Sequence, residues 1–83
     1  LFLPAGPNPA RSSVSLEVAS GASGPLRVTL LDLLGREVHV VHDGPSRPHQ
    51  RLRADTSTLA PGVYVLVARA GSRVQTQALT VVQ

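Results

Sequence analysis

The chain has 83 residues and no cysteine, so it has room for one small core and can form neither a disulfide framework nor a thiolate metal site. Eight arginines and no lysine stand against five acidic residues, and the resulting net charge of +3 is spread along the sequence. Nucleic-acid readers cluster their cations and interleave aromatic side chains, so a chain with one Phe and one Tyr is predicted to have no nucleic-acid partner.

The sequence shows neither a signal peptide nor a membrane-spanning segment. No apolar run approaches the about 20 residues that a membrane-spanning helix needs, so we predict no transmembrane segment. Residues 1–3 are apolar, but they are too few for a signal peptide and lack a basic region before them. We therefore expect the last piece of a longer protein, with the targeting signal and the main activity upstream.

The N-terminal part predicts an irregular incoming segment followed by strands. Prolines within residues 1–12 fix φ and withhold backbone donors, so this stretch is not helical and leads into the first strand. In residues 13–19 apolar and polar side chains alternate, which is typical of a half-buried strand. A second alternating strand begins at Leu26, after a loop over residues 20–25.

A hairpin is predicted next. Asp32 can cap a tight turn with its carboxylate and Gly35 supplies positive φ, so residues 36–42 are expected to return antiparallel to the preceding strand. In the returning strand, the side chains of Val38 and Val40 are expected on one side, and those of Glu37 and His39 on the other.

The next segment predicts a loop, a short strand and a capped turn. Residues 43–48 are loop by composition, and residues 50–55 form a strand with Leu52 and Ala54 inward. The polar residues 55–58 favour bonds to the local backbone and drop the following leucine into the core.

Residues 63–70 are predicted to form the central strand. They are apolar on both parities and lie between two turn signals, a pattern typical of a strand buried on both faces. The apolar parity changes along the last strand, residues 73–82, so we expect a bulge near residues 77–78.

The fold class that follows is all-β: a small antiparallel sandwich of six to seven strands. Frequent turn signals separate the strands, and no helix longer than one turn is needed.

Four segments stand out together by their order and spacing. They are residues 7–10 with Pro7, Asn8 and Pro9, residues 32–38 with Asp32 and Gly35, residues 59–64 with Leu59, Gly62 and Tyr64, and Gly71 followed by residues 74–82. From about Pro7 to the C-terminal residue, the chain resembles the type A C-terminal sorting domain of the type IX (Por) secretion system. The chain departs from that family in two ways: Gly6 stands where an aromatic or apolar residue is usual, and Gln75 and Gln77 stand where lysines are usual.

The resemblance implies an immunoglobulin-like sandwich over residues 7–83, with residues 1–6 coming in from an upstream linker. It also implies partners: the outer-membrane secretion machinery, a sortase-like peptidase, and a cargo domain upstream in the same chain. The exported protein would then lie at the outer-membrane surface or outside the cell of a Gram-negative bacterium of the Bacteroidetes type. We expect a monomer that needs no cofactor, with the nine named motif residues serving in structure or recognition. A related immunoglobulin-like family in flagellar hook-capping proteins shares much of the pattern.

Patterns that could carry chemistry have simpler explanations. His39 and His42 would point to opposite faces of a regular strand, so they cannot share a metal unless a bulge intervenes, and with His49 we expect surface histidines. Asp55, Ser57 and His49 include the residue types of a hydrolase triad, but no nucleophile elbow accompanies them. We therefore predict no catalytic, metal or cofactor residues.

Three functions remain to be compared. The first is a non-enzymatic sorting and surface-attachment module. The second is an immunoglobulin-like spacer or accessory module of a surface enzyme, with weak carbohydrate affinity, although Phe2 and Tyr64 are the only aromatic platforms available. The third, an independent enzyme, would require activity of the isolated domain, and we expect none.

Overall fold

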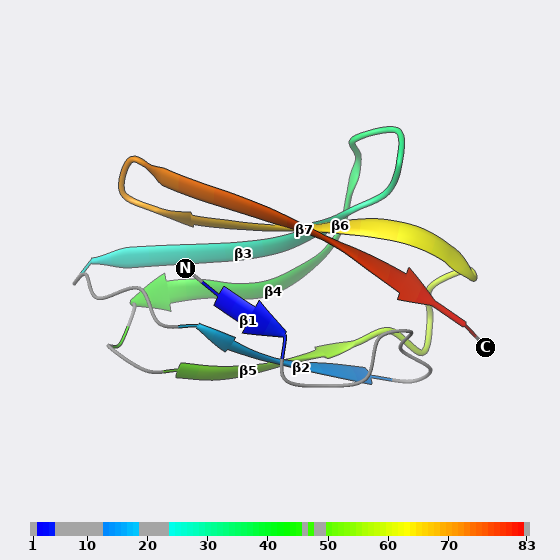
Figure 1. Ribbon diagram of the computed structural model, residues 1–83, viewed down its shortest axis with the longest axis horizontal. Coiled ribbons are helices and arrows are strands. Elements are labelled where there is room, and N and C mark those ends of the chain that lie inside the picture. Colours follow the sequence, from blue (N-terminus) through cyan, green and yellow to red (C-terminus); the bar gives the residue numbers. More distant parts are fainter. Residues whose placement is uncertain (1, 5–12, 19–23, 46, 48–49, 83) are drawn as a thin grey trace.

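A computed structural model describes residues 2–4, 13–18, 24–45, 47 and 50–82 of the chain (Figure 1). The seven strands are β1 (Phe2–Pro4), β2 (Ser13–Val18), β3 (Pro25–Leu31), β4 (Glu37–Pro45), β5 (Gln50–Asp55), β6 (Gly62–Ala70) and β7 (Arg73–Val81). They form a three-stranded sheet in the order β1-β2-β5 and a four-stranded sheet in the order β4-β3-β6-β7, and every pairing is antiparallel. The described residues contain no helix, and the two sheets lie face to face (Figure 1). The predicted all-β sandwich is confirmed.

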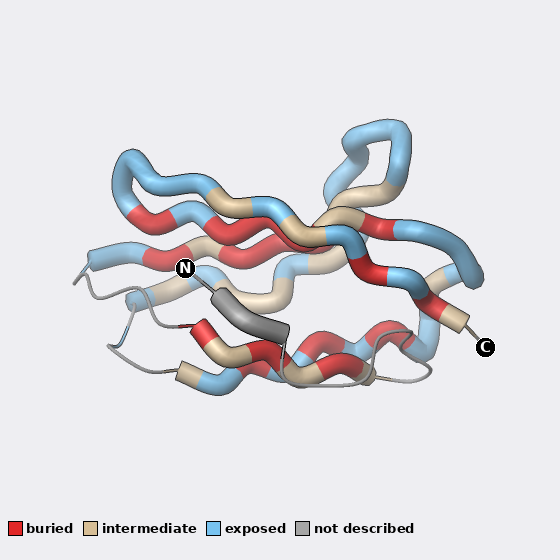
Figure 2. The backbone as a smooth tube through the Cα atoms, in the orientation of Figure 1, coloured by how far each residue is buried: buried red, intermediate tan, exposed pale blue. Residues whose placement is uncertain are grey.

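The core lies between the sheets and follows the period of two in the sequence. Alternate residues of β2 are buried, and their neighbours Ser13, Ser15 and Glu17 are half-buried (Figure 2). The fully buried large side chains are Val14, Leu16, Val18, Leu26, Val28, Leu30, Leu66 and Val81. Each sheet contributes one layer of apolar side chains to the core. Neither sheet could therefore bury its apolar face alone.

The hairpin of β3 and β4 is confirmed, but β4 is less regular and longer than predicted. Its register against β3 shifts twice, between Val28 and Thr29 and again between Leu30 and Leu31, which leaves Val41 and Val38 as extra residues. The strand also continues to Pro45, so the loop predicted over residues 43–48 begins too early.

The predicted bulge near residues 77–78 is wrong. β7 pairs with β6 from Arg73 to Val81 without a register shift. Leu79 and Val81 face the core, so the period of two places Gln75 and Gln77 on the core side and turns Val74 outward, where it is 53% exposed. Two glutamines on the inner side of an edge strand are tolerable because long amide side chains can reach water there.

β6 is central in its sheet but is not buried on both faces throughout. Its inward residues Tyr64, Leu66, Ala68 and Ala70 are buried, whereas on the outer face only Val67 is buried and Val63 is 43% exposed. The prediction of two-sided burial therefore holds for the middle of the strand alone.

The two long edges of the sandwich differ. On one side β4 contacts β5, and Nε2 of His42 and Nε2 of Gln50 lie 3.5 Å apart between them. On the other side are β1 and β7; like β4 and β5, each of them pairs with one strand only among the described residues. β1 lies within residues 1–12, where no strand was predicted.

Candidate functional site

Asp32 organises the connection between β3 and β4. Its Oδ1 accepts hydrogen bonds from the backbone N–H groups of Leu34 and Arg36, each at 2.9 Å, and its Oδ2 accepts one from Arg36 Nε at 2.8 Å. Gly35 has φ of +84° and donates its N–H to the Asp32 carbonyl at 3.0 Å. The predicted Asp cap and the positive-φ glycine are both present, so this turn is held by side chain and backbone together.

The hydrogen bonds of this turn lower the pKa of the Asp32 carboxyl below its usual value, and the backbone N–H of Arg36 is the largest cause. Beside the turn, Arg27 of β3 donates two hydrogen bonds of 2.9 Å to the Glu37 carboxylate of β4. This pair lowers the pKa of Glu37 and raises that of Arg27. The charged side chains of Asp32 and Arg36 in the turn, and of Arg27 and Glu37 on the two strands, are therefore paired with each other.

The segment before β6 forms a corner. The Leu59 N–H donates to the carbonyl of Thr56 at 3.1 Å, and the Leu59 side chain packs partly buried against the core. The Tyr64 ring is buried and its hydroxyl donates to the carbonyl of Ala60 at 2.6 Å. Tyr64 thus closes the corner, and Gly62 begins the strand that carries it.

Strand register brings most of the described motif residues to one end of the sandwich. β6 begins beside the end of β3, where Leu31 pairs with Val65, and Gly62 pairs with Val81 at the end of β7. The Asp32 turn, the Tyr64 corner and the end of β7 therefore share that end. Gly71, with φ of +62°, lies in the β6–β7 turn at the opposite end. Pro7, Asn8 and Pro9 lie outside the described residues.

The residues of the hydrolase-like set have a structural role where they are described. Asp55 Oδ1 accepts from the Ser57 N–H at 3.0 Å and from the Ser57 hydroxyl at 2.7 Å, and these bonds lower the pKa of Asp55, the hydroxyl most. A hydroxyl that donates to a carboxylate in its own turn is capping that turn. His49 lies outside the described residues.

The bulge at Val41 changes the histidine geometry. His42 pairs with Val28 and His39 with Leu30, two residues of one buried face, so both imidazoles lie on the inner side of β4. Opposite faces for the two histidines were predicted for a regular strand, and the bulge at Val41 removes that regularity. His42 Nε2 lies 3.2 Å from the carbonyl oxygen of Pro45, and within the described part no three His, Asp or Glu side chains gather to hold a metal ion.

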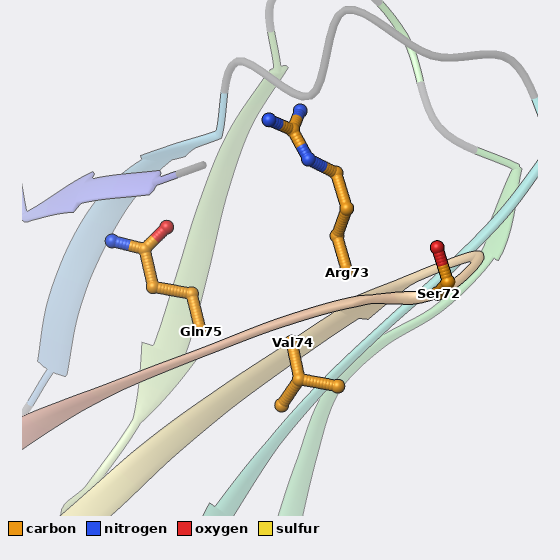
Figure 3. Close-up of a pocket in the computed structure, with 4 residues that line it drawn as sticks. All are labelled: Ser72, Arg73, Val74 and Gln75. Atoms are coloured by element: carbon orange, nitrogen blue, oxygen red, sulfur yellow. The ribbon is translucent and has the colours of Figure 1, made fainter.

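An open hollow of about 460 Å³ lies at the start of β7, lined by Ser72, Arg73, Val74 and Gln75 (Figure 3). The side chains of Arg73 and Gln75 extend to one side of the strand and Val74 to the other (Figure 3). These four lining residues include no carboxylate and no imidazole.

Leu33 and Leu34 are the most exposed large apolar residues of the described part, at 72% and 79%, and neither is among the predicted motif residues. The signal was available, because turn positions favour Gly, Pro, Asn, Asp and Ser, and this turn places two leucines there.

Comparison with known proteins identifies the family. A search of curated proteins finds none that matches the chain. In the part that the structure describes, no helix has the length and apolar character needed to cross a membrane. The family model described as the secretion system C-terminal sorting domain matches residues 6–82, nearly the whole chain. Members of that family are sorting signals and do not form a class of enzymes. They occur in proteins that are exported by secretion of the Bacteroidetes type. The chain belongs to the C-terminal sorting domain family of the type IX secretion system.

Proposed function

We propose that residues 7–83 are the sorting module of a larger exported protein and that residues 1–6 join it to an upstream cargo domain. The module is read by the outer-membrane secretion machinery and cut by a sortase-like peptidase, and the cargo is then released or attached at the cell surface. The observation that carries this proposal is the family match over residues 6–82.

The last strand is the part that we propose the machinery contacts. β7 is an edge strand, and among described residues it pairs with β6 alone. An exposed sheet edge presents backbone donors and acceptors that can accept a partner strand. Val74 and Ala78 are exposed on the outer side of β7, next to that edge. We also propose that the motif residues around Asp32, Tyr64 and Gly71 hold the sandwich in shape for this contact.

The alternative of a carbohydrate-binding accessory module is less well supported. Sugar binding commonly uses exposed aromatic faces, but Tyr64 is 8% exposed and its hydroxyl is bonded within its own corner. No observation on the described residues favours this second function.

The test is a fusion of residues 1–83 to the C-terminus of a reporter that carries an export signal, expressed in a type IX host. We expect the reporter outside the cell, and we expect removal of residues 71–83 to leave it in the periplasm. That truncation also removes Leu79 and Val81 from the core, so a variant that keeps the fold is needed.

Val74→Glu with Ala78→Glu changes only exposed positions of β7, and Val40→Glu, at an exposed valine of β4, is its matched control. We expect the β7 pair to reduce export and the control to retain it. Export at the parent level from both the truncation and the β7 pair would overturn recognition through the last strand.

A further inference from the structure

The fold does not require large apolar side chains at the exposed positions of Leu33 and Leu34. They are 72% and 79% exposed, whereas the exposed valines Val38, Val40, Val63 and Val74 range from 38% to 53%. The β3–β4 connection that carries them projects away from both sheets and is exposed over residues 33–36 (Figures 1 and 2). Turn chemistry there is already supplied by Asp32 and Gly35, so two leucines between them serve no purpose in the turn itself.

Hydrogen bonds in the turn fix the backbone that carries these two leucines. The Leu34 N–H is bound by the Asp32 carboxylate, and the next two residues are bound to Asp32 as well, Gly35 through its N–H at 3.0 Å and Arg36 through its N–H at 2.9 Å. The Asp32 N–H in turn donates to the Arg36 carbonyl at 2.9 Å. An apolar group that is ordered before binding loses less conformational entropy when a partner covers it.

The charges around the turn favour a protein partner over a membrane surface. The β3–β4 hairpin as a whole carries Arg27 and Arg36 against Asp32, Glu37 and Asp43, two cations against three anions, and all five take part in ion pairs. Apolar side chains that insert into an anionic lipid surface are normally accompanied by surplus Lys or Arg, which this hairpin lacks. A second copy of the chain is also a poor match, because three of the four residues lining the described hollow are polar.

We propose that Leu33 and Leu34 form a two-leucine knob that docks into an apolar pocket of a protein subunit of the outer-membrane secretion machinery. The proposal rests on the sorting function proposed above and adds a second contact to it. The pocket has an apolar floor for the two side chains and a neutral or basic rim, because the hairpin carries three acidic residues against two arginines.

The test replaces the knob and keeps the turn. In the reporter fusion, Leu33→Asn with Leu34→Asn retains Asp32, Gly35 and all backbone donors, and Val40→Thr with Val63→Thr removes exposed apolar surface from β4 and β6 as the matched control. We expect the knob variant to lower export at least tenfold with an unchanged Tm of the purified 83-residue chain, and the control to stay within twofold of the parent.

A photoreactive phenylalanine analogue at position 34, compared with one at position 40, identifies what the knob touches during export. We expect the cross-link from position 34 to join a protein subunit of the machinery. Cross-linking only to lipid or to a second copy of the chain would overturn the proposal, as would flotation of the purified chain with phosphatidylglycerol vesicles that depends on both leucines.

The two proposals fail in different ways. If the parent fusion is exported and the knob variant is exported equally well, the knob is wrong and the sorting function stands. If the parent fusion stays in the periplasm, both are overturned.

Discussion

The hydroxyl of Tyr64 donates a 2.6 Å hydrogen bond to the carbonyl of Ala60, four residues earlier, and ties the start of β6 to the corner before it. The ring is buried, so Tyr64→Phe keeps the packing and removes the bond alone. We expect a loss of about 0.5–1.5 kcal/mol in the free energy of unfolding. Urea denaturation of the purified chain measures it, and a variant as stable as the parent would show that the corner does not depend on this bond.

Core packing gives the largest single effect. Leu30 is fully buried near the end of β3, and Leu30→Ala leaves a cavity between the sheets. We expect a loss of about 2–5 kcal/mol, enough to unfold much of so small a domain. Val74→Ala on the exposed side of β7 is the control and should change stability by less than about 0.5 kcal/mol. Equal effects of the two changes would mean that the side of β7 facing the core has been misassigned.

Gly71 tests the backbone of the β6–β7 turn. Its φ of +62° lies in the left-handed region, and an added Cβ would meet no atom within 4 Å, so any cost of substitution is conformational rather than steric. We expect Gly71→Val to lose about 1–2 kcal/mol or more and Gly71→Asn to lose less, because Asn tolerates this region. Chemical denaturation of both variants decides it, and equal losses would contradict a purely conformational origin.

Acid should weaken the domain through its turn carboxylates. Hydrogen bonds lower the folded pKa values of Asp32, Glu37 and Asp55, so between the folded and unfolded pKa values the unfolded chain binds more protons. Their contribution to stability is complete above the unfolded values, near pH 4–5, and is lost as the pH falls through the depressed folded values.

The measurement is Tm from pH 7 down to pH 2. We expect a plateau above about pH 5, a decline below it, and a shallower decline for Asp32→Asn, which no longer titrates at this position. An equally steep decline in that variant would remove Asp32 from the account.

Much of the fold could be predicted from the period of two, because a strand with one apolar face has one stable orientation. The strand at Ser13–Val18 and the hairpin turn at Asp32 and Gly35 follow from local pattern. The strand Phe2–Pro4 does not, since it is defined by pairing with Glu17 and its neighbours, distant in sequence. The bulges at Val38 and Val41 were missed because their positions depend on the register against β3.

The last strand shows how an apolar residue can mislead. Val74 suggested an inward side chain and therefore a change of parity, but Leu79 and Val81 set the register and Val74 faces outward. The candidate site was predictable to a similar degree. Asp32 and Tyr64 were identified through motifs. The two leucines at turn positions were a local signal for Leu33 and Leu34, but that signal does not record how far the hairpin projects and therefore how exposed they are.

The central claim is that this sandwich directs export through the type IX machinery. The most direct measurement is the location of a reporter fused to residues 1–83 in two otherwise identical hosts, one with a working type IX machinery and one without it. The account predicts the reporter outside the first host and in the periplasm of the second. Equal amounts of external reporter in both hosts, or periplasmic reporter in both, would contradict it.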